Sequence, residues 1–343
     1  MGPRATLRRY LAWALFWLLA IAVLPHALNW QLGPPRSDAS ILASLVRRAL
    51  GDVDTMDPGA KFGIVFGDSV NRLTDVSNAP ELTLLIRYEL LKSRGKSLGD
   101  MPLLPLVCDG FKPSDYDVLS RAFASRAIKP AWVLIPVNLR AFSASWYASG
   151  LWKHPELERF LPWGDLLRGK GWQPAEESLV AFGAQKLDER WSHVGDLPRD
   201  LGAYYRNFVD LAFVPALARH GKSDCASLQA NYLGGLDGQN PMLESLRACV
   251  RTWARAGVPA VVYATPINMA LLRDCSPNGD SVARASLLAI LNAAASEGAS
   301  IFNYSEIMPP DAFYQRVNEH LRYPYKLALA HRIAADMAMT LKP

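Results

Sequence analysis

Four residues that could take part in chemistry stand beside apolar or helical stretches of the chain. Ser69 follows an apolar run in K-F-G-I-V-F-G-D-S, and Gly110 and Asn138 follow two later apolar runs. His320 precedes the last predicted helix, in N-E-H-L-R-Y. A serine becomes a nucleophile when a base removes its proton, and N–H groups stabilise the oxygen that turns negative during acyl transfer. The group predicts acyl transfer, whereas Asp68 and Ser69 alone are equally typical of an Asx turn after a strand.

The residue types suggest a role for each member of this group. We expect Ser69 to be the nucleophile; a backbone N–H of its turn, the N–H of Gly110 and the side-chain amide of Asn138 would form the oxyanion hole. Gly110 also allows close approach of the backbone, because it has no Cβ. Of the six histidines, His320 is the predicted base, since a loop before a helix can carry it over the sheet edge. His331 falls inside the predicted helix and is interpreted as structural.

Short apolar runs alternate with helical patterns, which is typical of a doubly wound parallel sheet covered by helices on both faces. In such a sheet the carboxyl ends of the strands share one edge, so Ser69, Gly110 and Asn138 are expected to lie there. In the predicted helix at 80–93, apolar residues at helical spacing indicate the buried face, namely Leu82, Leu84, Leu85, Tyr88, Leu90 and Leu91. The predicted strands are 62–66, 103–108, 132–137, 258–265 and 300–303, and the predicted helices are 39–50, 80–93, 113–126 and 324–341.

A long stretch between the third and fourth predicted strands, about 141–240, lacks this regular alternation. It is rich in aromatic residues and in turns such as G-K-G-W, and we interpret it as a large, mainly helical insertion. Exposed tryptophans could stack on the apolar faces of sugar rings; alternatively, the aromatic residues build a small core of the insertion itself. The tryptophans are Trp146, Trp152, Trp163, Trp172 and Trp191.

The amino-terminal residues 1–33 predict a membrane anchor with one transmembrane helix. Basic residues precede an almost wholly apolar run at 11–24, which its flanks extend to about 20 residues. The basic flank favours a cytoplasmic amino terminus, so the rest of the chain is expected outside the cytoplasm. A cleaved signal peptide is the alternative, but no small-x-small site is well placed. We therefore expect a single-pass protein of the bacterial inner membrane, with 34–58 as a connector and 59–343 as the periplasmic domain.

Composition narrows the classes of function. The chain has 343 residues, half of them apolar, and a net charge of +5 without a long run of like charges, so no nucleic-acid partner is expected. The four cysteines form no C-x-x-C pair and have no histidine at ligand spacing, so we expect neither a metal site nor a cofactor. For an exported chain, we expect any disulfide to join two of Cys225, Cys249 and Cys275. Cys108 ends a strand and is expected to be a buried thiol.

Together these motifs resemble the SGNH, or GDSL-type, hydrolase superfamily. The matching blocks are G-D-S-V after the first strand, D-G-F after the second, P-V-N-L after the third and E-H-L before the last helix. The resemblance covers roughly 63–138 and 258–341. It implies a doubly wound, five-stranded parallel sheet of the SGNH or flavodoxin-like type. It also implies that Ser69 is the nucleophile, that Gly110 and Asn138 complete the oxyanion hole, and that His320 is the base.

One block departs from the family pattern. The family usually has an aspartate three residues before the histidine, and here that position is Val317. Asp311 is the candidate catalytic acid, because a loop could bring it to His320. The alternative is a Ser-His dyad whose imidazole is oriented by a backbone carbonyl. The residues expected to support the site are Asp68, Arg140 and Glu319.

A membrane anchor before such a domain is similar to accessory proteins of cell-surface polymer acylation, including the DltD-like and alginate-acetyltransferase-like groups. The resemblance implies an O-acyltransferase or esterase that acts on a cell-surface polysaccharide or an acylated carrier, beside a membrane-bound O-acyltransferase. A second interpretation is a non-catalytic scaffold that binds the polymer or the acyltransferase through the aromatic insertion. The missing aspartate favours the scaffold, and the four site residues favour the enzyme.

Overall fold

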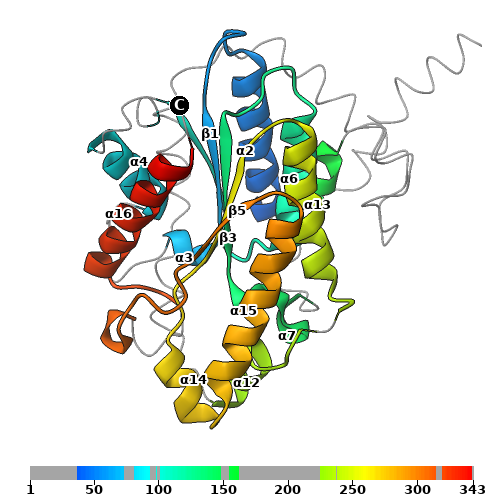
Figure 1. The fold of residues 1–343 in the computed structure, drawn as a ribbon. Helices are drawn as coiled ribbons and strands as arrows, with labels where there is room; N and C mark the ends of the chain where they lie inside the picture. The colour runs from blue at the N-terminus through cyan, green and yellow to red at the C-terminus, as the bar shows by residue number, and fades with distance from the viewer. Residues whose placement is uncertain are drawn as a thin grey trace, which may run out of the picture. The chain divides into compact units, whose positions relative to one another are not determined.

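A computed structural model describes residues 37–72, 81–92, 98, 101–147, 154–161, 225–236, 238–313 and 319–341 (Figure 1). The chain divides into two compact units. The first comprises Met1–Thr55 and His154–Tyr205, and the second comprises Met56–Lys153 and Arg206–Pro343. The second unit contains all the described strands and all the predicted site residues, so the account of the site concerns this unit alone.

The described part of the first unit consists of α2 (Ser37–Asp54) and the short 3-10 helix η3 (Pro155–Phe160), which touch each other. Leu42, Val46 and Val53 of α2 recur at helical spacing and are buried, so this helix is amphipathic. The sequence predicted a helix at 39–50, and the observed helix is longer at both ends.

The second unit is built on a five-stranded sheet in which all neighbouring strands are parallel, in the order β2-β1-β3-β4-β5 (Figure 1). All residues of the first four strands along the chain are buried, as expected for a sheet covered on both faces. The five predicted strands are confirmed, and the largest difference is at β4, predicted as 258–265. The strands are β1 (Gly63–Gly67), β2 (Leu103–Val107), β3 (Trp132–Val137), β4 (Ala260–Ala264) and β5 (Ser300–Asn303).

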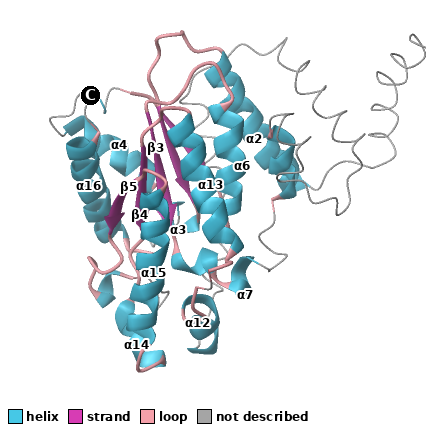
Figure 2. Ribbon diagram, turned by 45° about the vertical axis from the view of Figure 1, so that its right-hand side comes forward, coloured by secondary structure: helices cyan, strands magenta, loops and turns pink. Residues whose placement is uncertain are grey.

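Helices cover both faces of this sheet (Figures 1 and 2). On one face, α4 (Leu82–Lys92) packs against α16 (Tyr323–Thr340). On the other face, α13 (Pro241–Arg255) packs against both α6 (Pro113–Ala124) and α15 (Gly279–Ser296). Right-handed crossovers explain the division, because the step from β1 to β2 runs opposite to the later steps along the sheet.

The buried face that the sequence predicted for α4 is confirmed in part: Leu82, Leu85 and Leu90 are buried. Tyr88 and Leu91 are 53% and 44% exposed, whereas Thr83, Ile86 and Glu89 are buried. Apolar residues lie around much of this helix, so their spacing did not single out one face. The packing against α16 decides which face is buried.

Several short helices follow strand ends or lie near them. Asn138 and Asn268 cap two of these by accepting hydrogen bonds from backbone N–H groups. The short elements are α3 (Ser69–Arg72), η1 (Leu139–Phe142), α7 (Ala144–Tyr147), α12 (Cys225–Tyr232), α14 (Met269–Cys275) and η4 (Pro310–Ala312).

Two sequence predictions fall largely outside the described residues. The predicted membrane anchor at 1–33 lies wholly outside them, and no helix in the described part of the chain is long and apolar enough to cross a bilayer. Of the predicted insertion, the structure describes η1, α7, η3 and α12 and the residues next to them, which are mostly helical. Trp146 is described, and the other tryptophans named above for this stretch are not.

A disulfide joins the first residue of α12, Cys225, to the last residue of α14, Cys275. This confirms that the bridge uses two of the three expected cysteines. Cys249 is a buried thiol whose Sγ lies 3.0 Å from the Ser120 hydroxyl, between α13 and α6. Cys108 is also a thiol, but it is half-buried where the sequence predicted burial, because it lies just beyond the end of β2.

Candidate active site

The predicted nucleophile and oxyanion residues lie at the carboxyl ends of three adjacent strands. Ser69 is the first residue of α3, two residues after the end of β1. Gly110 lies in the turn after β2 and has a φ of 78°, a conformation that glycine adopts without strain. Asn138 directly follows β3. The sequence predicted that these strand ends share one edge of the sheet, and because β1 pairs with both β2 and β3, Ser69 follows the middle strand of the three.

Asp68 holds the turn that presents Ser69. Its buried carboxylate accepts hydrogen bonds from the Val70 N–H, at 2.9 Å, and from the Asn138 side-chain amide, at 3.1 Å. The first bond caps the amino end of α3 and the second joins this turn to the end of β3. The Val70 N–H is therefore occupied, which leaves the N–H of Ser69 itself as the candidate oxyanion donor of this turn.

Three N–H donors are candidates for an oxyanion hole. Among the described residues, neither the backbone N–H of Ser69 nor that of Gly110 has a hydrogen-bond acceptor. The Asn138 Oδ1 accepts the Arg140 N–H at 3.1 Å, which fixes the orientation of the amide. One hydrogen of that amide is donated to Asp68, and the other has no acceptor in the described part of the chain. A negative oxygen would provide an acceptor for such donors.

A buried ion pair links the end of β3 to the predicted base. Glu319, which is 0% exposed, pairs through Oε1 with the Arg140 guanidinium, and its Oε2 accepts a hydrogen bond from the Tyr232 hydroxyl at 2.5 Å. The guanidinium also stacks on the Trp146 ring, 3.9 Å from its centroid. Glu319 directly precedes His320, so these contacts fix the backbone beside the imidazole.

Charged side chains of the site are buried, or nearly so, in the protein. Burial raises the pKa of Asp68 from 3.8 to about 6, and the nearby Glu319 charge adds to this, against the opposing effects of Arg140 and Asn138. Burial alone would lower the pKa of Arg140, but the Glu319 carboxylate and the neighbouring Tyr232 and Asp68 outweigh it, so the pKa is raised. A cation between two acids therefore keeps its charge inside the protein.

His320 is buried, 6% exposed, three residues before α16 begins. Leu321 forms an antiparallel bridge with Phe313, and the Arg322 N–H donates to the Ala312 carbonyl at 2.8 Å. The hydroxyl of Ser69 makes no hydrogen bond to a described residue, His320 included. Catalytic hydrogen bonds are often long before a substrate binds, so the pairing of nucleophile and base stays a prediction.

The structure pairs the candidate acid with a different residue. Asp311, in η4, accepts a hydrogen bond from the Tyr325 hydroxyl at 3.1 Å, and the structure, where described, shows no hydrogen bond or ion pair between Asp311 and His320. Val317, at the position of the family's aspartate, lies outside these residues. The assignment of Asp311 as the catalytic acid therefore stays a prediction.

Sequence reasoning missed a buried lysine near Ser69. Lys326 of α16 is 1% exposed, and its ammonium donates to the Asn71 carbonyl of α3 at 3.3 Å. Asn71 in turn donates through Nδ2 to the Tyr263 hydroxyl at 3.1 Å, so α16, α3 and β4 are joined. A signal was present in the sequence, because Lys326 shares helical spacing with the buried Leu329 and Ile333.

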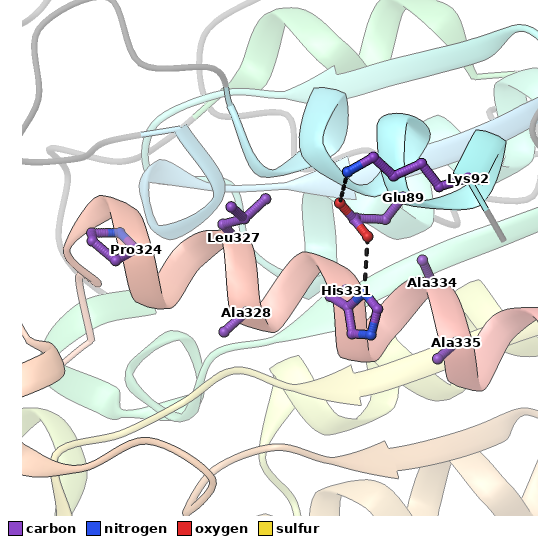
Figure 3. Close-up of a pocket in the computed structure, with 8 residues that line it drawn as sticks. All are labelled: Glu89, Lys92, Pro324, Leu327, Ala328, His331, Ala334 and Ala335. Carbon is purple, nitrogen blue, oxygen red and sulfur yellow. Dashed lines mark hydrogen bonds and ion pairs between the residues drawn. The ribbon is translucent and has the colours of Figure 1, made fainter.

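The described hollows of the surface lie elsewhere. One, of about 640 Å³, is lined by α4 and α16, and in it Glu89 lies between His331, at 2.8 Å, and Lys92, at 3.5 Å (Figure 3). The hydrogen bond with His331 is the main reason why the pKa of Glu89 is lowered. A second, of about 560 Å³, is lined by β5 and α16. None of the predicted catalytic or oxyanion residues lines either hollow.

The described residues offer no obvious place for a metal ion, because no three His, Cys, Asp or Glu side chains among them gather as a ligand set. Comparisons with known proteins assign no family: no family model matches the chain, and no curated protein matches it significantly. The resemblance to SGNH hydrolases therefore rests on the four short sequence blocks.

Proposed function

We propose that the protein is a serine-dependent acyl-transfer enzyme of the SGNH type, which acylates or deacylates hydroxyl groups of a cell-surface polysaccharide. One observation carries the proposal: donors without acceptors among the described residues, from Ser69, Gly110 and Asn138, stand at the ends of three adjacent strands. The strand order, which is also that of flavodoxin-like sheets, supports the SGNH-like fold. Such sheets bind ligands at the carboxyl ends of the strands.

In this proposal Ser69 forms a covalent acyl-enzyme. Its Oγ attacks the acyl carbonyl of the donor while His320 takes the hydroxyl proton. The donors at Ser69, Gly110 and Asn138 stabilise the negative oxygen, and His320 returns the proton to the departing alcohol. A polysaccharide hydroxyl then takes the acyl group in a transferase, and water takes it in an esterase.

Two features of the chain support the proposed location. The basic and apolar segment at 1–33 supports an anchor in the bacterial inner membrane. The disulfide between Cys225 and Cys275 supports a periplasmic domain, because disulfides persist in oxidising compartments. A domain held there could receive acyl groups from a membrane-bound O-acyltransferase or an acylated carrier.

A scaffold without catalytic activity is the second candidate. The observation that favours it is the state of the predicted catalytic residues, since the Ser69 hydroxyl has no hydrogen bond to a described residue and Asp311 is paired with Tyr325. The ion pair between Arg140 and Glu319 would then serve only stability.

A serine-reactive fluorophosphonate probe on the purified full-length chain separates the two candidates. For the enzyme, we expect labelling at Ser69 that is lost in Ser69→Ala. His320→Ala should slow labelling strongly and Asn138→Ala by roughly a hundredfold, because a base and an oxyanion donor are removed. The matched control is His331→Ala, which changes a histidine that is 74% exposed at its side chain and paired with Glu89. In this control, the probe should label Ser69 at the wild-type rate.

The same assay includes the result that contradicts the enzyme. The enzyme is contradicted if folded wild-type protein stays unlabelled and polymer acylation is unchanged in cells that carry Ser69→Ala. The non-catalytic scaffold would then be the remaining candidate. Asp311→Asn adds a test of the acid. Labelling that falls as in His320→Ala indicates a triad, and labelling that is unchanged indicates a dyad.

A further inference from the structure

Helix α12 joins the disulfide to the residue that precedes the predicted base. Its first residue, Cys225, is bridged to Cys275. Its last residue, Tyr232, donates a hydrogen bond to Glu319 at 2.5 Å. One short helix therefore runs between a covalent tether and the carboxylate beside His320.

Helix α12 packs against η1, α7 and α14, and the disulfide adds a covalent link to α14. Only Leu228 and Tyr232 of α12 are buried, and a helix of two turns has little stability of its own. Gln229 donates to the carbonyl of Cys275 at 2.9 Å, so this bond also depends on the segment that the disulfide fixes. Ser145 donates to the Ala230 carbonyl at 2.9 Å, on an exposed part of the helix. The disulfide is thus a covalent constraint on the helix that carries Tyr232, in addition to these noncovalent contacts.

The Tyr232 hydroxyl matters to Glu319 because the carboxylate is completely buried. A buried carboxylate is stable only when its oxygens are paired, and here Arg140 pairs with one oxygen and Tyr232 with the other. Removing the phenol hydroxyl would leave Oε2 without that donor, and the carboxylate would shift to find another. Glu319 is covalently next to His320, so such a shift would move the imidazole.

We propose that Tyr232 is a positioning residue for His320, which it holds through Glu319, and that the Cys225–Cys275 disulfide keeps Tyr232 in place. The catalytic consequence rests on the proposed role of His320 as a base. The placement of the ring does not depend on that role and can be measured separately.

The first experiment observes His320 directly, by NMR of the full-length chain with isotope-labelled histidine. The His320 signal is identified by its loss in His320→Gln. Tyr232→Phe should shift this signal and its titration midpoint, and Cys225→Ser/Cys275→Ser should shift both in the same direction. The matched control is Tyr304→Phe, which also removes a buried tyrosine hydroxyl from a carboxylate, at 2.9 Å from Asp336. This control should leave the His320 signal unchanged.

The second experiment measures the rate of Ser69 labelling against fluorophosphonate concentration. Tyr232→Phe should lower the maximal rate roughly tenfold without changing the concentration for half-maximal rate, because it misplaces the base without altering probe binding. The variant without the two cysteines should show a similar loss. Adding Tyr232→Phe to it should cause little further loss, because both changes act through one contact.

The two experiments keep this proposal distinct from the proposed function. An unreactive Ser69 with a shifted His320 signal would reject the enzyme and retain the positioning role. A His320 signal that is identical in wild type and Tyr232→Phe would overturn the positioning role. If the fold-losses in maximal labelling rate of Tyr232→Phe and of Cys225→Ser/Cys275→Ser multiply in the combined variant, the link between Tyr232 and the disulfide is overturned. If the variant without the cysteines does not fold, dithiothreitol can reduce the wild-type bridge instead, giving two thiols while the reagent forms its own cyclic disulfide.

Discussion

At the scale of single residues, Asp68 holds two neighbouring loops together, because one of its oxygens accepts the Val70 N–H and the other the Asn138 amide. The same carboxylate lies close enough to Glu319 for the two charges to interact, with Arg140 opposing the repulsion. The negative charge of Asp68 therefore strengthens the two hydrogen bonds that hold the loops, but burying this charge lowers the stability of the folded chain. How much of this charge is present depends on pH.

We expect part of the stability to fall as pH rises from about 4 to about 6. The pKa of Asp68 is raised from 3.8 to about 6 in the folded chain, so the folded state binds the proton more tightly than the unfolded state. Its contribution is present below the lower value and is lost as pH rises through the upper one, in total about 3 kcal/mol. Urea unfolding of Asp68→Asn across this range should lack that component. An identical pH dependence in wild type and variant would refute the assignment.

The residues of the candidate site differ in how far the sequence could predict them. Ser69 and Asn138 stand directly beyond apolar runs, so a strand pattern and a turn signal place them at the sheet edge. The helical spacing of Lys326 indicates its burial, but the hydrogen-bond partners of Tyr232 and Lys326 could not be predicted, because they lie 87 and 255 residues away along the chain. Contacts of this kind depend on the packing of distant elements.

At the scale of elements, the Trp132 side chain of β3 packs closely over Gly63 of β1. This residue pairs with Trp132 in the parallel register, and a Cβ added to it would overlap the indole ring. Trp132 is 1% exposed and is enclosed in the core, so it has little room to move. The glycine therefore permits the tryptophan to fill the space beside β1.

Gly63→Ala should destabilise the chain by about 1–3 kcal/mol, because an overpacked core forces side chains or backbone to shift. The matched control is Gly59→Ala, since a Cβ added there meets no heavy atom within 4 Å. It should change the free energy of unfolding by no more than about 0.5 kcal/mol. Urea denaturation of both variants provides the comparison. Equal stability of the two would show that Trp132 can be accommodated elsewhere.

The elements themselves were predictable to different degrees. The strands are short, apolar and buried throughout, so their sequence pattern is clear. The predicted buried face of α4 was wrong at Tyr88 and Leu91. Apolar residues lie around much of the helix, so the packing against α16 decides which of them are buried. The helices α13 and α15 were not predicted from the sequence, although buried positions recur along both at helical spacing.

At the scale of the whole molecule, the proposed export of the domain rests on two features. The amino-terminal segment has the charge asymmetry of a membrane anchor, and the described part of the chain contains a disulfide. The first feature lies outside the described residues, so its topology needs a direct measurement.

Reporter fusions made after residue 50 should locate the domain. Alkaline phosphatase, which is active only when exported, should be active there, and a cytoplasmic reporter at the same position should not. The reason is the basic flank, which retains the amino terminus in the cytoplasm. Replacing the three arginines at positions 4, 8 and 9 with glutamine is the control, and it should reduce the phosphatase signal. Strong activity of the cytoplasmic reporter would contradict the topology.

The long separation between β3 and β4 has a consequence for the order of folding. The strands β1, β2 and β3 are complete by Val137, whereas β4, which pairs with β3 along five residues, begins only at Ala260. As the chain emerges amino end first, three of the five strands are available long before the other two. During that interval the open edge of β3 is a template for pairing with other chains. We therefore expect aggregation during synthesis to depend most on how quickly the second half of the chain follows the first.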